Sequence, residues 1–208
     1  MMGLTLYKKV IIGIFMLFTL IPICKAQAIW EAGIKGGTNF YLGDVNSTIF
    51  NKLDPVYGIF ARINANPRFA TKFQFATGSI KSLFEQQYSD LSVQEEFNFF
   101  EYGLLNSDSW TRFFSPYIFG GIGVSTFTDS NKQILTPDIP FGFGVKYKVF
   151  DKVNIGLEWS MHKLFSDRFD HINNPYQNTT SAFTNNDWYS MATLMLSVDF
   201  GNRSSYCR

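Results

Sequence analysis

Residues 139–163 alternate apolar and polar side chains through one short interruption, and this alternation constrains the fold more than any other feature of the sequence. The apolar positions are Ile139, Phe141, Phe143, Val145, Tyr147 and Val149, then Val153, Ile155, Leu157, Trp159 and Met161. Glycine, lysine and other polar residues occupy the positions between them. Because two residues is the repeat of a β-strand, the stretch predicts a hairpin with one apolar and one polar face.

The same rule holds in other parts of the chain, which makes the predicted fold all-β. The segments that obey it are 30–41, 56–64, 69–79, 91–102, 116–127, the two halves of the hairpin, and 188–200. In the glycine-rich segment 116–127, Ile118, Ile122 and Val124 form the preferred apolar face. Eight amphipathic strands predict a closed antiparallel barrel or a two-sheet sandwich.

The predicted links between these strands differ in length. Links of about a dozen residues follow the first, third and fifth segments, and about two dozen residues follow the seventh, against a usual hairpin link of about two to five. The second and sixth links are short, and the fourth is somewhat longer. Longer links that alternate with shorter ones are typical of transmembrane barrels, whose two rims differ.

The amino terminus has the pattern of a secretory signal peptide. Two lysines precede an apolar run at residues 10–23, and small residues follow at Ala26 and Ala28, where cleavage is expected. A lipoprotein signal ending at Cys24 is the alternative, but Ile23 is bulky where such a site needs a small residue. The run is too short for a spanning helix.

These features divide the chain into a signal peptide at residues 1–28, a barrel at residues 29–200 and a tail at residues 201–208. The exported chain then keeps one cysteine, Cys207, in the tail. A single thiol in an oxidising compartment is either free or bridges to another chain.

The direction of the apolar face decides between a soluble barrel or sandwich and a membrane barrel. The chain is 46% hydrophobic and 18% aromatic, yet its mean hydropathy is only −0.03. Trp188 and Phe200 lie on one apolar face at a spacing that spans about 30 Å in a tilted strand, the thickness of a hydrocarbon core. Glycines recur on the opposite face, which suits the narrow interior of an eight-stranded barrel. Together with the export signal, these observations favour an outer-membrane barrel.

In that orientation the charged residues face the lumen, where unpaired charges are costly. We therefore predict an internal ion-pair network of Glu31, Lys35, Arg62, Lys72, Glu96, Lys146, Lys148, Glu158 and Asp199. Aromatic residues on the apolar face predict a membrane girdle of Trp30, Tyr147, Trp159, Trp188 and Phe200. Glu95 is the exception, because the alternation places it on the lipid side, where a bulge or a protein partner would relieve its cost.

Candidate catalytic, metal and cofactor sites are absent from the sequence pattern, so we expect no enzyme activity. His162 and Ser160 alternate inward, whereas a lipid-modifying barrel hydrolase needs a His and Ser facing the bilayer. His162, Asp167, Asp170 and His171 lie close in sequence but lack the ligand spacing of a zinc or calcium motif. The net charge of +1 gives no support for a nucleic-acid partner.

Several blocks of the sequence resemble one known family. "EAGIKGGTNFYLGDVN", "EEFNFFEY", "PYIFGGIGV", "IPFGFGVKY", "IGLEWSMHKLFSD" and the terminal "NDWYSMATLMLSVDF" are similar to PorG-like outer-membrane β-barrels of the type IX secretion system. The similarity runs from about residue 31 to residue 200, and residues 171–186 and the tail do not match it.

The resemblance implies a non-enzymatic outer-membrane component of a Gram-negative bacterium, with both termini in the periplasm. It implies partners among periplasmic ring proteins of the PorK and PorN type, which the barrel would anchor, and no cofactor. In that setting Cys207 is a candidate for a disulfide to a ring protein. A stand-alone barrel with a structural, adhesive or narrow-pore role is the alternative.

Overall fold

The computed structural model describes residues 29–42, 53–81, 85–102, 113–129, 132–165 and 188–200. The expected signal peptide at residues 1–28 and the expected tail with Cys207 lie outside these residues. No helix within the described ranges is long and apolar enough to cross a membrane.

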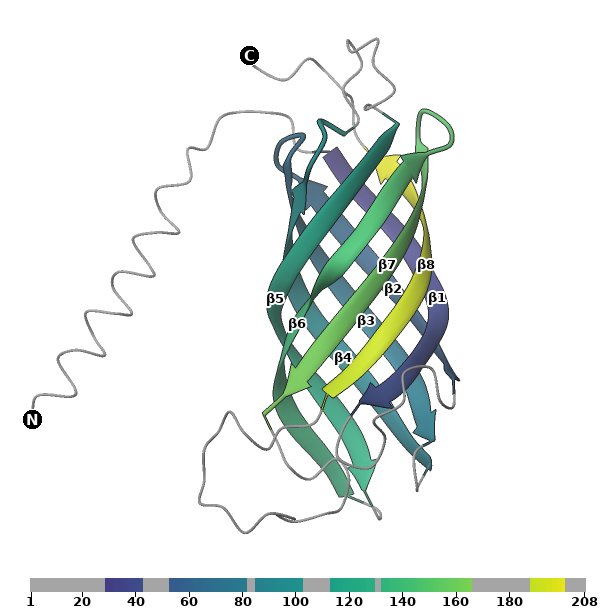
Figure 1. Ribbon diagram of the computed structural model, residues 1–208, viewed down its shortest axis with the longest axis vertical. Helices are drawn as coiled ribbons and strands as arrows, with labels where there is room; N and C mark the ends of the chain where they lie inside the picture. Colours follow the sequence, from purple (N-terminus) through teal and green to yellow (C-terminus); the bar gives the residue numbers. More distant parts are fainter. Residues whose placement is uncertain are drawn as a thin grey trace, which may run out of the picture.

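The described chain forms a closed antiparallel barrel of eight strands, which confirms the predicted fold class (Figure 1). Each strand pairs with the next along the chain, and β1 pairs with β8 to close the ring. The strands are β1 (Ile29–Leu42), β2 (Asp54–Asn64), β3 (Phe69–Lys81), β4 (Glu85–Asn98), β5 (Phe114–Asp129), β6 (Lys132–Lys148), β7 (Val153–Leu164) and β8 (Trp188–Phe200).

The two ends of the barrel are distinguished by the course of the strands. The start of β1, the end of β8 and the turn between β6 and β7 lie at the upper end in Figure 1, which we call the terminal rim. The opposite end, where β1, β3, β5 and β7 finish, is called the loop rim. Closure leaves no unpaired sheet edge, because both flanking strands of the sequence pair with each other.

Two links at the loop rim are shorter than predicted. The β3–β4 ladder continues to the pair Lys81↔Glu85, and the β5–β6 ladder continues to Asp129↔Lys132. The links are therefore residues 82–84 and 130–131, not a dozen residues each. The prediction ended each strand where its apolar residues ended, but backbone pairing does not depend on apolar side chains. Link length consequently does not alternate between the rims, and β4 ends at Asn98 rather than at residue 102.

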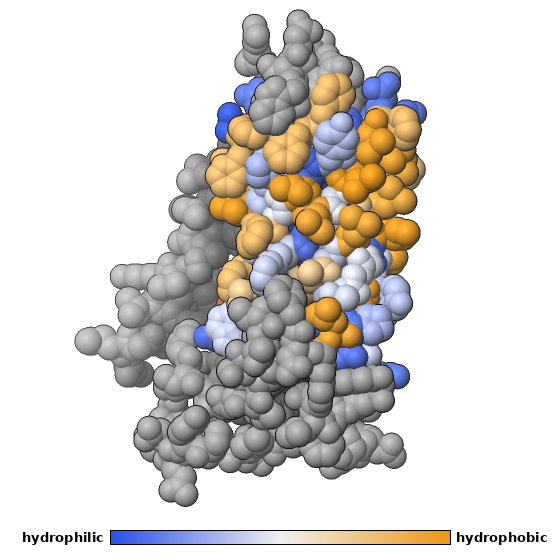
Figure 2. All heavy atoms as spheres, turned by 45° about the vertical axis from the view of Figure 1, so that its right-hand side comes forward, coloured by the Kyte–Doolittle hydropathy of each residue, from blue (hydrophilic) through white to orange (hydrophobic). Residues whose placement is uncertain are grey.

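The apolar residues face outward and the charged residues face inward. Ile34, Ile122 and Leu157 are 61%, 72% and 57% exposed on the outer wall. Figure 2 shows apolar residues gathered over the described part of one side of this wall. The predicted outward face of the fifth strand is confirmed, because Ile118, Ile122 and Val124 are all exposed.

Phe40 departs from this pattern. The alternation of β1 places it on the outer face, but its side chain is buried. Its ring meets that of Trp159 edge-on, with ring centroids 6.4 Å apart. Phe40 therefore packs against protein.

The interior is filled in two apolar layers separated by polar groups. One layer lies toward the loop rim and contains Val56, Ala76, Tyr88, Phe127, Leu164, Tyr189 and Met191. The other contains Phe60, Tyr117, Phe119 and Met195. An eight-stranded barrel is just wide enough for side chains to fill it, and these residues occupy that space.

Candidate functional site

The centre of the lumen is a network of ion pairs built around Glu96 of β4. One oxygen of Glu96 lies 2.5 Å from Lys146 Nζ and 2.9 Å from Arg62 Nε, and the other lies 3.3 Å from Lys72 Nζ. The three cations come from β6, β2 and β3, so one carboxylate ties four strands together. All four side chains are buried, which makes the network dependent on complete pairing.

Glu158 of β7 forms the second centre of the network. Lys72 Nζ lies 2.5 Å from Glu158 Oε2, and the Tyr117 hydroxyl donates to the same oxygen at 2.7 Å. Tyr117 reaches Glu158 by crossing Gly144, where an added Cβ would lie 2.6 Å from the Tyr117 hydroxyl. The glycine at this position therefore makes room for the tyrosine.

Glu31 of β1 joins the network through Arg62. The two side chains lie 2.6 Å apart between Nη1 and Oε1, and the Ser197 hydroxyl donates to the same Glu31 oxygen at 2.5 Å. Lys35, also on β1, donates to Gln74 Oε1 at 2.9 Å. These contacts connect β8 and β1 to β2 and β3 across the closing seam of the barrel.

A smaller polar group lies near the terminal rim. Lys148 Nζ lies 2.6 Å from Asp199 Oδ2, and Asn154 donates to the other Asp199 oxygen at 2.7 Å. The Tyr102 hydroxyl donates to Asn154 at 2.9 Å. Tyr102 follows the end of β4 and is buried, so it covers this group.

Aromatic rings pack against the lumen cations. Lys146 Nζ lies 4.4 Å from the centre of the Tyr117 ring, and Lys72 Nζ lies 4.6 Å from that of Phe119. Arg62 lies over Phe60 at 5.1 Å. Since each ring face attracts a cation, the rings replace part of the hydration that these cations lose. The described lumen is consequently a packed core.

All nine residues of the predicted network are buried in the lumen. Eight of them form ion pairs with one another, and Lys35 bonds to Gln74 instead. Strand alternation gave their direction, but not their partners across the barrel. The roles of Tyr117 and Phe119 were missed, because both lie in the glycine-rich segment whose polar face holds few polar residues.

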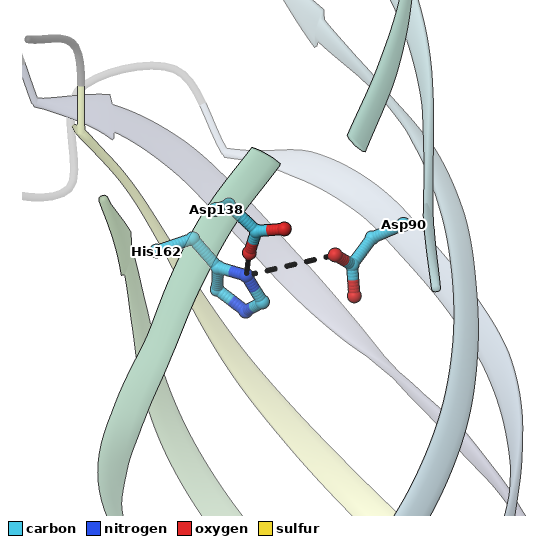
Figure 3. A group of neighbouring side chains, drawn as sticks. All are labelled: Asp90, Asp138 and His162. Carbon is cyan, nitrogen blue, oxygen red and sulfur yellow. Dashed lines mark hydrogen bonds and ion pairs between the residues drawn. The ribbon is translucent and has the colours of Figure 1, made fainter. Parts of the chain in front are cut away.

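A second polar cluster, which we call the triad, consists of Asp90, Asp138 and His162 (Figure 3). These residues come from β4, β6 and β7, and all three are buried. His162 Nδ1 lies 2.8 Å from Asp138 Oδ2 and 3.8 Å from Asp90 Oδ2. Sequence spacing missed this cluster, since its members lie far apart along the chain and meet only when the barrel closes.

The predicted girdle residues lie on the outer wall, and four of them lie near a rim. Trp30 and Phe200 pair with each other at the terminal rim, where each is about half exposed. Tyr147 lies near the same rim, and Trp188 begins β8 at the loop rim. Trp159 does not fit the prediction, because it lies midway along β7. Its indole Nε1 donates to Ser190 Oγ at 2.6 Å, which satisfies this polar atom within the wall.

Glu95 faces outward as the alternation predicted. Its neighbours in the ladder are Thr71 and Gly120, and the pairing is continuous on both sides, so no bulge turns it inward. The Thr71 hydroxyl donates to Glu95 Oε1 at 2.7 Å. This hydrogen bond partly satisfies a carboxylate on an apolar surface.

The closed eight-stranded ladder, the apolar outer wall and the buried charged lumen define the transmembrane β-barrel of the outer-membrane class. Within this class, the sequence profile of a family described as a domain of unknown function, DUF6089, matches residues 8–208. The chain belongs to this family. No curated protein sequence matches it.

Solved structures with a similar fold include several outer-membrane proteins. Neisserial surface protein A is 10% identical, with 83% of this chain and 97% of that chain covered and a TM-score of 0.51. Ail, the attachment invasion locus protein of Yersinia pestis, is 11% identical, with 83% and 99% covered and a TM-score of 0.50. A major outer membrane protein from Thermus thermophilus is 9% identical, with 84% and 100% covered and a TM-score of 0.50. At these identities the likeness establishes the fold.

Proposed function

We propose that this barrel is a non-enzymatic component of the type IX secretion system that anchors a periplasmic ring complex to the outer membrane. The observation that carries the anchoring role is the packed lumen, in which Lys72 of β3 meets Glu158 of β7 from the opposite wall. A lumen crossed by buried ion pairs and filled by aromatic rings does not favour a pore. The remaining surfaces for function are the outer wall and the two rims.

The assignment to this secretion machine rests on the sequence blocks that resemble PorG-like barrels. In the proposed arrangement both termini are periplasmic, and the terminal rim faces ring proteins of the PorK and PorN type. Trp30, Tyr147 and Phe200 lie at this rim, where they would fix the barrel at the lipid headgroups.

Crosslinking in intact cells tests the partner. A tagged copy of the barrel is crosslinked mildly, extracted in detergent and analysed by mass spectrometry, with an unrelated tagged eight-stranded barrel as control. Ring proteins recovered only with this barrel support the proposal. Their absence, with lipids and bulk outer-membrane proteins recovered equally from both, would assign the barrel a stand-alone role.

Two further measurements separate the alternatives. In planar bilayers we expect no steady conductance from the purified barrel, whereas a large steady conductance would favour transport. For Cys207, which lies outside the described residues, we propose an intermolecular disulfide with a ring protein. A non-reducing gel of native membranes should then show a band that disappears with reductant and in a Cys207→Ser strain. If unreduced membranes with the unsubstituted barrel show no such band, this contact is rejected.

A further inference from the structure

The triad places three metal-binding atom types at one point in the lumen. The imidazole nitrogen and the two carboxylate oxygens lie within 4.8 Å of one another. Figure 3 shows both carboxylates on the same side of the ring, with the two contacts meeting at one nitrogen of His162. The anchoring role and the ion-pair network do not use these residues.

The carboxylates of the triad lack the partners that the other lumen acids have. Each of the four predicted lumen acids has a Lys or Arg nitrogen within 2.9 Å. Asp90 and Asp138 have no Lys or Arg nitrogen within 4.0 Å among the described residues. The nitrogen that lies near both carboxylates is Nδ1 of His162. Two buried carboxylates close together are unfavourable unless a positive charge compensates them.

Unpartnered polar atoms at the triad provide an independent observation. Asp138 Oδ1 and Thr136 Oγ1 are buried without a hydrogen-bond partner in the described chain. Thr136 lies two residues before Asp138 on the same inward face of β6, and it pairs with Ser125, whose hydroxyl donates to Asp90. Buried polar atoms in folded proteins normally have partners, so these atoms indicate a missing one.

Neighbouring residues leave space for the Asp138 side chain and hold the side chains of Asp90 and His162 in place. An added Cβ at Gly123, which pairs with Asp138, would lie 2.5 Å from Asp138 Oδ1. Asp90 accepts hydrogen bonds from Ser92 and Ser125 at 3.3 Å each. The Tyr189 ring stacks on the His162 ring with centroids 4.5 Å apart. Supporting contacts of this kind orient the ligands of metal sites.

We propose that Asp90, Asp138 and His162 bind a divalent transition-metal ion of the zinc type inside the barrel. Imidazole nitrogen and carboxylate oxygen are zinc ligands, and a divalent charge balances two carboxylates. Calcium is a poorer match, because it takes about six to eight oxygen ligands. Asp138 Oδ1, which has no hydrogen-bond partner among the described residues, supplies a further oxygen atom at the site.

The position of the triad determines how the ion enters. The apolar layer toward the loop rim includes Tyr88, Phe127 and Leu164, which lie two residues from Asp90, Ser125 and His162 respectively. This layer separates the triad from the loop rim. The ion therefore binds as the barrel folds, joins β4, β6 and β7, and afterwards exchanges slowly.

The test is to fold the exported chain, residues 29–208, from urea into detergent micelles with Zn²⁺ or with chelator. Excess metal is removed by chelator and gel filtration, and zinc per barrel is measured by elemental mass spectrometry. We expect about one zinc ion per barrel and a higher urea midpoint than for chelator-folded protein, as for metal sites coupled to folding. His162→Gln and Asp90→Asn should each retain less than about a tenth as much, because even loss of a supporting contact weakens metal sites about 10–100-fold.

Asp199→Asn is the matched control, since it removes a buried lumen carboxylate at the other end of the barrel. It should retain zinc as the unsubstituted chain does. Equal zinc retention in the unsubstituted chain and His162→Gln, or none in either, overturns the proposal. If a triad variant does not fold, Co²⁺ replaces Zn²⁺ in the unsubstituted barrel. A visible absorption band from bound Co²⁺ then supports the site, and its absence rejects it.

Discussion

Lys72 and Glu158 lie 86 residues apart in the sequence, and their side chains meet at 2.5 Å in the lumen. β3 and β7 are four strands apart in either direction around the closed ladder, so this ion pair joins opposite walls. Neither side chain is exposed to solvent. A pair of this kind links the halves of the barrel through its centre, in addition to the backbone ladder at the wall.

Removing one partner of this pair should destabilise the barrel strongly. Lys72→Met leaves Glu158 without its ion-pair partner, and breaking a buried ion pair in this way costs about 3–5 kcal/mol. The measurement is urea unfolding of the barrel in lipid vesicles. Arg68→Gln is the control, because Arg68 and Glu101 form an exposed pair at 3.8 Å whose loss should cost less than about 1 kcal/mol. Equal effects of the two substitutions would contradict the central role of the lumen pair.

Glu95 and Glu96 are adjacent in sequence and should respond oppositely to substitution by leucine. Glu96→Leu leaves three cations short of their shared carboxylate, and we expect a loss of at least about 3 kcal/mol. Glu95→Leu replaces an outward carboxylate by an apolar residue and should be neutral or stabilising by up to about 2 kcal/mol in a bilayer. Unfolding in vesicles measures both. Destabilisation by Glu95→Leu would contradict this account and would show that the hydrogen bond from Thr71 outweighs the cost of the outward carboxylate.

The alternation of residues predicted strand number, wall direction and the burial of charges, because each depends on a single strand. It placed Arg62 and Glu96 inside without any knowledge of their separation. It did not predict which charges meet. Strand tilt and the closure of β1 on β8 decide which residues of distant strands lie at the same level along the barrel axis, and the sequence of one strand does not contain that information. The triad was missed for the same reason.

Link lengths were mispredicted for a different physical reason. Apolar alternation marks only the part of a strand that lies against lipid, whereas the ladders continue through polar residues to Lys81 and Asp129. Trp159 shows a related limit of the pattern. The alternation places an aromatic residue on the outer face, but it does not tell how far that residue lies from either rim. Its place midway along β7 follows from strand bounds that the pattern underestimates.

Gly144 should tolerate substitution much less well than Gly120. Alanine at position 144 places a methyl group against the Tyr117 ring and hydroxyl and against the Leu157 carbonyl oxygen, and displaces the hydroxyl from Glu158, at a cost of about 1–3 kcal/mol. An added Cβ at Gly120 meets no atom within 4 Å, so Gly120→Ala should change stability little. Urea unfolding compares them. Adding Tyr117→Leu to Gly144→Ala should cost less than the sum of the single changes, because the two act on the same contact. Simple additivity would rule out the contact with Tyr117 as the source of the cost and leave the contact with the Leu157 carbonyl oxygen.

The outward direction of the apolar wall is tested by Ile122, which is 72% exposed near the middle of β5. Ile122→Lys places a charge at the centre of the proposed lipid contact, and we expect a loss of about 2–4 kcal/mol in vesicles. Leu53→Lys is the control, because Leu53 is exposed just before β2 at the loop rim, where the cost should fall below about 1 kcal/mol. A wall in contact with water would give no such difference between the two positions, since lysine at an exposed position in water carries no desolvation cost. Equal stability of the two variants, or a gain for Ile122→Lys, would therefore place the apolar wall outside the bilayer.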